Sequence, residues 1–215
     1  MDSNSPKKED EAIILDYLSL GYVKPDMTSF KGSAIAQAIG TQRFNLLELS
    51  PKKGVDLEIL EEVYIGPGKR DRISSVKRKL NYDDLTATSR IEIEYAIKQI
   101  IESQEEKYVN FFNEAGPIST RLHKLELIPG IGKKHREAIL KARNEKPFES
   151  FEDIKERVPV LTDPIGMLTN RIKLEIDTNT VKKGKNKYYL FTQIPNRSNG
   201  KRRPNKGRKT RYNKR

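Results

Sequence analysis

The hydrophobic pattern of this chain changes its period once, near residue 81, and that change constrains the fold more than any other feature. Before it, short apolar runs such as AIILDYL, FNLLELS and VYIG are separated by stretches rich in glycine and proline. Such runs are typical of short strands joined by tight turns. After it, apolar residues recur every three or four positions, as on one face of a helix, and the clearest stripe consists of Ile93, Ala96, Ile97, Ile100 and Ile101. The sequence therefore predicts an α+β protein in which a β unit precedes an all-helical unit.

The strand FNLLEL carries apolar residues on both faces. Phe44 and Leu46 share one face with Glu48, whereas Leu47 and Leu49 lie on the other, because side chains alternate along a strand. This mixed alternation favours a small curved barrel over a flat sheet.

Helical signals continue to about residue 176. Ser150 with Asp153 three residues later is a capping pattern that opens a short helix. Asp163 followed by Pro164 opens the last helix, because proline at the first helical position loses no hydrogen bond. Farther on, residues 187–191 (KYYLF) are expected to form a final strand that could return to the β unit.

Composition limits the chemistry that the chain can perform. No run approaches the ~20 apolar residues of a membrane span, and residues 1–10, a flexible polar end, lack the apolar segment of a signal peptide. We therefore expect a cytoplasmic protein with no membrane partner. The chain has no cysteine and two histidines, which excludes thiolate chemistry and leaves little scope for a histidine metal cluster. Accordingly, we expect no metal, no cofactor and, since no converging carboxylates are evident, no catalytic residues.

The positive charge is concentrated at the C-terminal end. The net charge is +12, with 42 basic and 30 acidic residues, and ten of the basic residues lie within 196–215, which contains no acid. A segment of this composition cannot bury enough apolar surface to order itself, so we expect a disordered tail whose natural partner is a polyanion. A tail that only improves solubility is the alternative. The candidate phosphate-contacting residues of the tail are Arg197, Lys201, Arg202, Arg203, Lys206, Arg208, Lys209 and Arg211.

The stretch LELIPGIGKKHREAIL predicts a tight turn between two helices, the first of them a short one whose apolar face is formed by Leu122, Leu125 and Ile128. We expect Gly130 and Gly132 to allow the sharp reversal of the backbone and Ile131 to point into the core. The amide N–H groups at the start of the second helix would then face solvent, where they and the helix dipole attract an anion. Lys133 and Lys134 add full positive charges beside them. Backbone donors bind phosphate without reading bases.

This stretch strongly resembles the helix-hairpin-helix motif, over residues 119–144. The resemblance implies phosphate contacts at Gly130, Gly132, Lys133 and Lys134, with Ile131 as a structural residue. In the usual LPGIG signature the first residue is leucine, whereas here it is Ile128. The motif does not distinguish DNA from RNA. A helical hairpin used only for packing or for protein contacts is the alternative.

A wider resemblance covers roughly residues 10–195 and excludes the tail. It rests on AIGTQRFNLLELSPKKG, VYIGPGKRDRISSVKRKLNYDDLT, FFNEAGPISTRLHKLELIPGIGKKHREAIL and PFESFEDIKERV. These segments resemble an archaeal family known as a conserved domain of unknown function, whose members are described as predicted RNA-binding proteins. The resemblance implies an OB-like β-barrel (residues 11–82) joined to a helical domain with a helix-hairpin-helix (83–176), and then a C-terminal strand region (177–195).

A second basic surface is predicted at residues 66–79. Lys69, Arg70 and Arg72 lie in or beside a glycine loop, and Lys77 and Lys79 follow on one face of the next strand, opposite Arg78. On an OB-like barrel such a loop and strand could follow a phosphate backbone. A solvated charge run explains the same pattern.

The sequence hypothesis is therefore a non-enzymatic protein that binds structured RNA, in a ribosome or translation setting, through the turn, the barrel loop and the tail. Two alternatives remain open. One is a structure-specific DNA-binding factor in repair or recombination, and the other is a scaffold that binds proteins.

Overall fold

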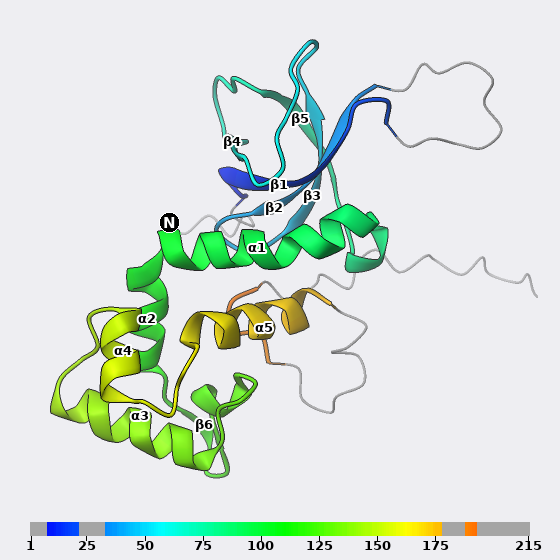
Figure 1. Ribbon diagram of the computed structural model, residues 1–215. Helices are drawn as coiled ribbons and strands as arrows, with labels where there is room; N and C mark the ends of the chain where they lie inside the picture. Colours follow the sequence, from blue (N-terminus) through cyan, green and yellow to red (C-terminus); the bar gives the residue numbers. More distant parts are fainter. Residues whose placement is uncertain (1–7, 22–32, 178–187, 193–215) are drawn as a thin grey trace, which may run out of the picture.

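The computed structural model describes residues 8–21, 33–177 and 188–192, and all structural statements below concern these residues (Figure 1). Five strands form one antiparallel sheet: β1 (Glu11–Leu18), β2 (Ile35–Gly40), β3 (Leu46–Pro51), β4 (Glu62–Tyr64) and β5 (Ile73–Lys79). Their order is β4-β1-β2-β3-β5, so β4 and β5 are the two edges. The sheet is thus a half-barrel, open between its edge strands.

The central strands of the half-barrel are buried on both faces. Ile13 and Leu15 of β1 join the core beneath the helices, whereas Ile14 lies in a second core inside the half-barrel. In β3, Leu46 likewise joins the core beneath the helices, and Leu47 lies in the core inside the half-barrel. The mixed alternation predicted for this strand is therefore present, and its physical reason is that each face packs against a different layer.

The expected order, a β unit and then helices, is confirmed. After a short 3-10 helix, η1 (Tyr82–Asp84), come α1 (Ala87–Ser103), α2 (Glu105–Glu114), α3 (Lys133–Glu145), α4 (Phe151–Arg157) and α5 (Pro164–Ile176). Both predicted caps are present, because Ser150 accepts a hydrogen bond from the backbone N–H of Asp153 and Asp163 accepts one from Gly166. None of the helices in the described part of the chain is long and apolar enough to cross a membrane.

Helix α1 connects the sheet to the other helices, packing on β1 on one side and on α5 on the other (Figure 1). Its N-terminus is fixed by polar side chains of the sheet. The Gln37 side chain donates to the carbonyl of Asp84 (3.0 Å) and accepts from the N–H of Thr86 (2.9 Å), and the hydroxyl of Thr86 donates to Asp16 (2.6 Å). One hydrophobic core consequently runs from the sheet through α1 into the helical region.

Two local predictions were wrong. The chain before the Pro129–Gly132 turn is not an α-helix: it forms a small hairpin of β6 (Pro117–Ser119) and β7 (Leu122–His123), then one 3-10 turn, η2 (Lys124–Leu127). Residues 188–191 are not a strand of the half-barrel either. They lie in the helical region, where the ring of Phe191 packs against Tyr108 and Phe111, with centroids 5.7 and 5.0 Å apart.

Candidate nucleic-acid interface

The segment Pro129–Gly132, called here the glycine turn, reverses the chain between η2 and α3. Gly130 has φ +91°, a conformation that residues with a side chain rarely adopt. Ile131 is buried, and its N–H donates to the carbonyl of Ile128 (3.0 Å). The predicted inward position of Ile131 is confirmed, and it fixes the turn to the core while the glycines remain exposed.

Helix α3 begins without a side-chain cap. Its N-cap residue is Gly132 (φ −93°, ψ −173°), and the first intrahelical bond runs from the N–H of Arg136 to the carbonyl of Gly132 (2.9 Å). The amides of Lys133 and Lys134 precede that bond, so they lack intrahelical partners. An ideal Cβ at Gly132 would meet nothing within 4 Å. The start of α3 therefore offers backbone N–H donors that have no side-chain cap and lie next to open space.

The short limb before the turn is held by His123 and Glu126. The Nδ1 atom of His123 accepts the N–H of Leu125 (3.2 Å), and Glu126 accepts the N–H of His123 (2.9 Å). Glu126 also pairs with Arg136 of α3 at 3.2 Å, which ties the two limbs together. Burial, and then the charges of Arg143, Arg136 and Lys124 against the opposing Glu126, lower the pKa of His123. His123 thus serves as a neutral cap. Upstream of this limb, Ser119 ends β6.

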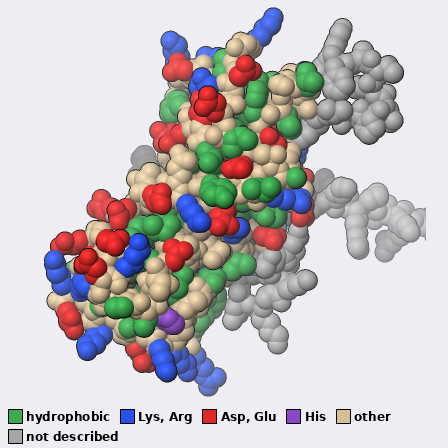
Figure 2. Space-filling model, viewed as in Figure 1, with side chains coloured by type: hydrophobic (Ala, Val, Ile, Leu, Met, Phe, Trp, Pro, Cys, Tyr) green, Lys and Arg blue, Asp and Glu red, His purple; other side chains and the backbone are tan. Residues whose placement is uncertain are grey.

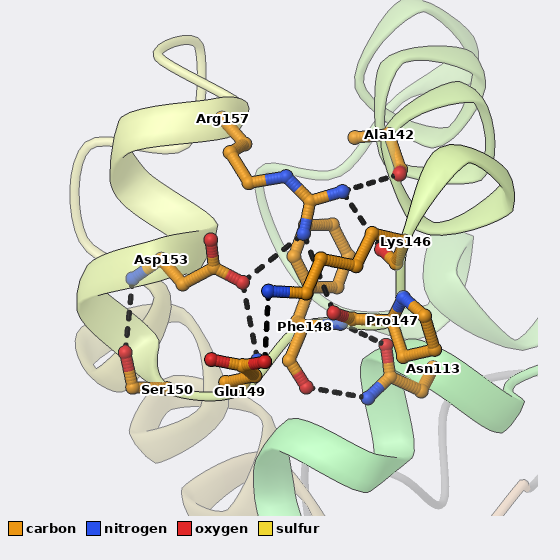
Figure 3. A network of polar contacts seen from close by, with 9 residues as sticks. All are labelled: Asn113, Ala142, Lys146, Pro147, Phe148, Glu149, Ser150, Asp153 and Arg157. Atoms are coloured by element: carbon orange, nitrogen blue, oxygen red, sulfur yellow. Dashed lines mark hydrogen bonds and ion pairs between the residues drawn. The ribbon is translucent and has the colours of Figure 1, made fainter.

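The far end of α3 is closed by Arg157 of α4 (Figure 3). Its guanidinium donates to the carbonyls of Ala142 (2.5 Å) and Lys146 (2.7 Å), pairs with Asp153 (3.1 Å), and lies 4.9 Å from the ring centroid of Phe148. Phe148 is in turn bound by Asn113 of α2 through two hydrogen bonds of 2.8 and 2.9 Å. This network, which the sequence did not reveal, fixes the direction in which α3 presents its N-terminus.

Helix α5 supports the glycine turn from behind. The Met167 side chain would be 3.4 Å from a Cβ on Gly130, and Arg171 donates to the carbonyl of Leu127 (3.1 Å). Arg171 also pairs at 2.7 Å with Glu175, which is buried.

Glu175 holds residues 188–192, called here the C-terminal strap. Its carboxylate accepts the N–H groups of Leu190 (2.8 Å), Phe191 (3.0 Å) and Thr192 (2.9 Å). These bonds satisfy the amides that a strand would have used, which explains why the predicted strand does not form. Arg171 donates to the carbonyl of Tyr188 as well, so one ion pair connects the strap and the limb before the glycine turn.

Positive charge is exposed at the glycine turn. Lys and Arg side chains gather at the end of the molecule where α3 begins (Figure 2). Lys133 and Lys134 are exposed, and neither side chain makes a hydrogen bond or ion pair with any described residue. The acids Glu126 and Glu137 of this region both contact Arg136. The two lysines therefore leave an uncompensated positive charge beside the open amides.

The basic residues of the half-barrel differ in whether another described residue already binds their side chains. Arg72 pairs with Glu61 at 2.5 Å, Arg70 donates to the carbonyl of Gly66 (2.9 Å), and Lys79 donates to Asn45 (2.8 Å). By contrast, Lys69 and Lys77 are exposed and make no such contact with the described residues. This surface thus offers two free lysines where the sequence suggested five free cations. Arg78, predicted on the opposite face, pairs with Glu48 at 2.9 Å.

The candidate residues do not form one cluster. Helix α1 lies between the half-barrel and α5, which supports the glycine turn, so the turn is separated from the sheet (Figure 1). The tail candidates Arg197 to Arg211 lie outside the described residues. Within the described ranges, no three His, Asp or Glu side chains are grouped so that they could hold a metal ion.

Comparisons with known proteins identify relatives over most of the chain. The family model described as "protein of unknown function (DUF655)" matches residues 8–193. The uncharacterized protein MJ0038 of Methanocaldococcus jannaschii is 43% identical over 192 residues, which cover 88% of this chain and 83% of that protein. The crystal structure of Af1531 from Archaeoglobus fulgidus is similar with a TM-score of 0.77 at 42% identity, covering 86% of this chain and 100% of that one. With matches of this extent in sequence and in structure, the chain belongs to the DUF655 family.

Proposed function

We propose that this protein is a non-enzymatic nucleic-acid-binding protein, with structured RNA as its preferred target, acting in a ribosome or translation setting. The observation that carries the proposal is the glycine turn: open amides at the start of α3, with Lys133 and Lys134 beside them and Ile131 fixing the turn from within. Such a surface suits a phosphate, which accepts hydrogen bonds from backbone donors and is attracted by the helix dipole. The turn acts as the phosphate-binding half of a helix-hairpin-helix whose first limb is a single 3-10 turn.

The half-barrel provides a second contact in this proposal. The strand order β4-β1-β2-β3-β5 is compatible with an OB-like barrel opened between β4 and β5. In OB-folds the loop between strands 4 and 5 contributes to oligonucleotide binding, and here that loop carries Lys69. Lys77 follows on the exposed edge strand β5. The same lysine also discourages another strand from pairing at this edge, so its role in binding needs its own test.

Substitutions at Gly132 test the proposal. We expect Gly132→Asn and Gly132→Asp to fold, since φ is negative and the space is open, and both side chains can cap the helix. Gly132→Asp should stabilise the protein by a few tenths of a kcal/mol to about 1 kcal/mol. The same variant should bind RNA least, because its negative charge occupies the position of the phosphate. The expected order of affinity is wild type, then Asn, then Asp. Stability that falls in step with affinity would mean that the turn is only structural.

Salt dependence tests the charge contribution. Each phosphate contact adds about −0.7 to −0.9 to the slope of log affinity against log salt. Lys133→Gln should reduce the magnitude of the slope by about one contact, whereas Lys141→Gln, the same charge change at an exposed position farther along α3, should not. Parallel titrations with duplex RNA and duplex DNA of one sequence measure the preference for RNA. Flat slopes with both would reject nucleic-acid binding and favour a protein-binding scaffold.

A further inference from the structure

A hollow of ≈ 380 Å³ lies beside the glycine turn and is lined by Tyr82, Pro129, Asn170, Lys173, Leu174 and Asp177. Three parts of the fold meet here: η1 directly after β5, the glycine turn, and the last two turns of α5. A nucleic-acid strand that leads from the turn toward the half-barrel would cross this hollow. Its volume is at the lower end of the ~300–1,000 Å³ that small-molecule sites occupy.

The lining of the hollow suits a flat aromatic ring with polar edges. Tyr82 offers an aromatic ring, and the guanidinium of Arg90, 5.8 Å from the ring centroid, helps to hold it in place. Leu174 offers an exposed apolar side chain, and Asn170 an exposed carboxamide. A carboxamide both donates and accepts hydrogen bonds, as the edge of a base requires.

The charges around the hollow favour a base over a phosphate. The C-terminal end of α5 carries partial negative charge. Lys173, the basic group of the lining, is paired with Glu94 at 2.8 Å. The helix end thus favours a base edge bearing N–H donors over a phosphate. The positively charged turn suits the phosphates of a nucleic-acid strand, and the hollow suits one of its bases.

We propose that the hollow receives a single unpaired nucleobase from the strand whose phosphates bind at the glycine turn, so that the preferred target is a bulged or looped duplex. This inference rests on the proposed function and adds a structural preference to it. A base already outside the stack avoids the unstacking cost of a few kcal/mol that a paired base would require. Aromatic stacking of one base changes affinity by about tenfold.

The test compares a perfect RNA duplex with the same duplex carrying one bulged 2-aminopurine. Wild type should prefer the bulged RNA by about tenfold, and the fluorescence of the bulged base should change on binding. Tyr82→Ala should lose the preference and Tyr82→Phe should keep it. Asn170→Ala, at an exposed position where folding is not at risk, should weaken the preference. Tyr95→Ala, an exposed tyrosine on α1 outside the hollow, is the matched control and should change nothing.

The outcomes separate this inference from the proposed function. Steep salt slopes with both RNAs but no preference for the bulge would overturn the base site and leave phosphate binding intact. Flat slopes with both RNAs would overturn the two together. A preference for the bulge that survives both Tyr82→Ala and Asn170→Ala would place the base elsewhere and contradict the inference.

Discussion

Single polar side chains position the loops of this protein by accepting backbone N–H groups. Glu9 is buried and accepts the N–H groups of Gln42 (3.0 Å), Arg43 (3.2 Å) and Asn45 (3.2 Å), which shapes the turn between β2 and β3. Glu175 does the same for the C-terminal strap and His123 for η2. A buried acceptor of this kind stabilises several amides that would otherwise be unsatisfied.

Gly40→Ala tests the Glu9 arrangement. A Cβ at Gly40 would lie 2.2 Å from the Cδ atom of Glu9, so the carboxylate must move away from the turn. We expect a loss of about 1–3 kcal/mol in the free energy of unfolding, measured by chemical denaturation. Gly116→Ala, where a Cβ meets nothing within 4 Å, is the control and should cost much less. Equal losses would show that Glu9 does not define the turn.

The lowered pKa of His123 predicts a pH dependence of stability. Because the folded state holds the imidazole neutral as an acceptor, the unfolded chain binds the proton more readily. The contribution of His123 is complete above about pH 6.5 and is lost as the pH falls through the lower folded pKa. His123→Asn keeps a cap without the titration, so it should lose less stability than wild type between pH 7.5 and pH 5. Identical pH profiles would contradict this assignment.

At the scale of elements, α3 is held at both ends by different means. Its N-terminus follows the glycine turn and has no side-chain cap, whereas its C-terminal carbonyls are bound by Arg157. One end is therefore satisfied within the protein and the other remains open to a ligand. This asymmetry is what a helix N-terminus that binds an anion requires.

Replacement of Arg157 tests how firmly α4 holds α3. Arg157→Lys cannot reproduce the planar fork that reaches two carbonyls and Asp153 at once. We expect a loss of about 1–3 kcal/mol by chemical denaturation, together with weaker RNA binding if the orientation of α3 matters. Lys155→Ala on the same helix removes only an exposed ion pair with Glu152 and should stay within ~0.5 kcal/mol. Similar effects of the two variants would mean that Arg157 adds no more than a surface contact.

At the scale of the whole molecule, the strap determines where the described part of the chain ends. Residues 188–192 are bound to α5 by Glu175, and Arg171 connects the same ion pair to the carbonyl of Leu127 before the glycine turn. The last described residue, Thr192, therefore lies in the helical region that carries the turn, whereas the predicted return strand would have placed it at the half-barrel. The part played by the tail in binding stays a prediction.

Removal of residues 196–215 tests the tail. The deletion leaves every described residue in place, so the free energy of unfolding should not change. We expect the slope of log affinity against log salt to lose several units, because ten basic residues are removed. If affinity and slope both survive the deletion, the tail serves solubility alone. A variant whose tail has the same composition but a shuffled order of residues should recover the slope of log affinity against log salt.

The sequence by itself determined the order of strands and helices, the caps at Ser150 and Asp163, and the turn in which Ile131 is buried between exposed glycines. These features depend on hydrophobic period and on contacts within a few residues, which are local properties of the chain. Only the tertiary structure decided that Arg72 and Lys79 are engaged, that the limb before the turn is a 3-10 turn, and that the strap binds Glu175. The physical reason is that the two cations and the strap depend on partners at least eleven residues away, and the limb, though capped locally by His123 and Glu126, is also tied to Arg136 of α3.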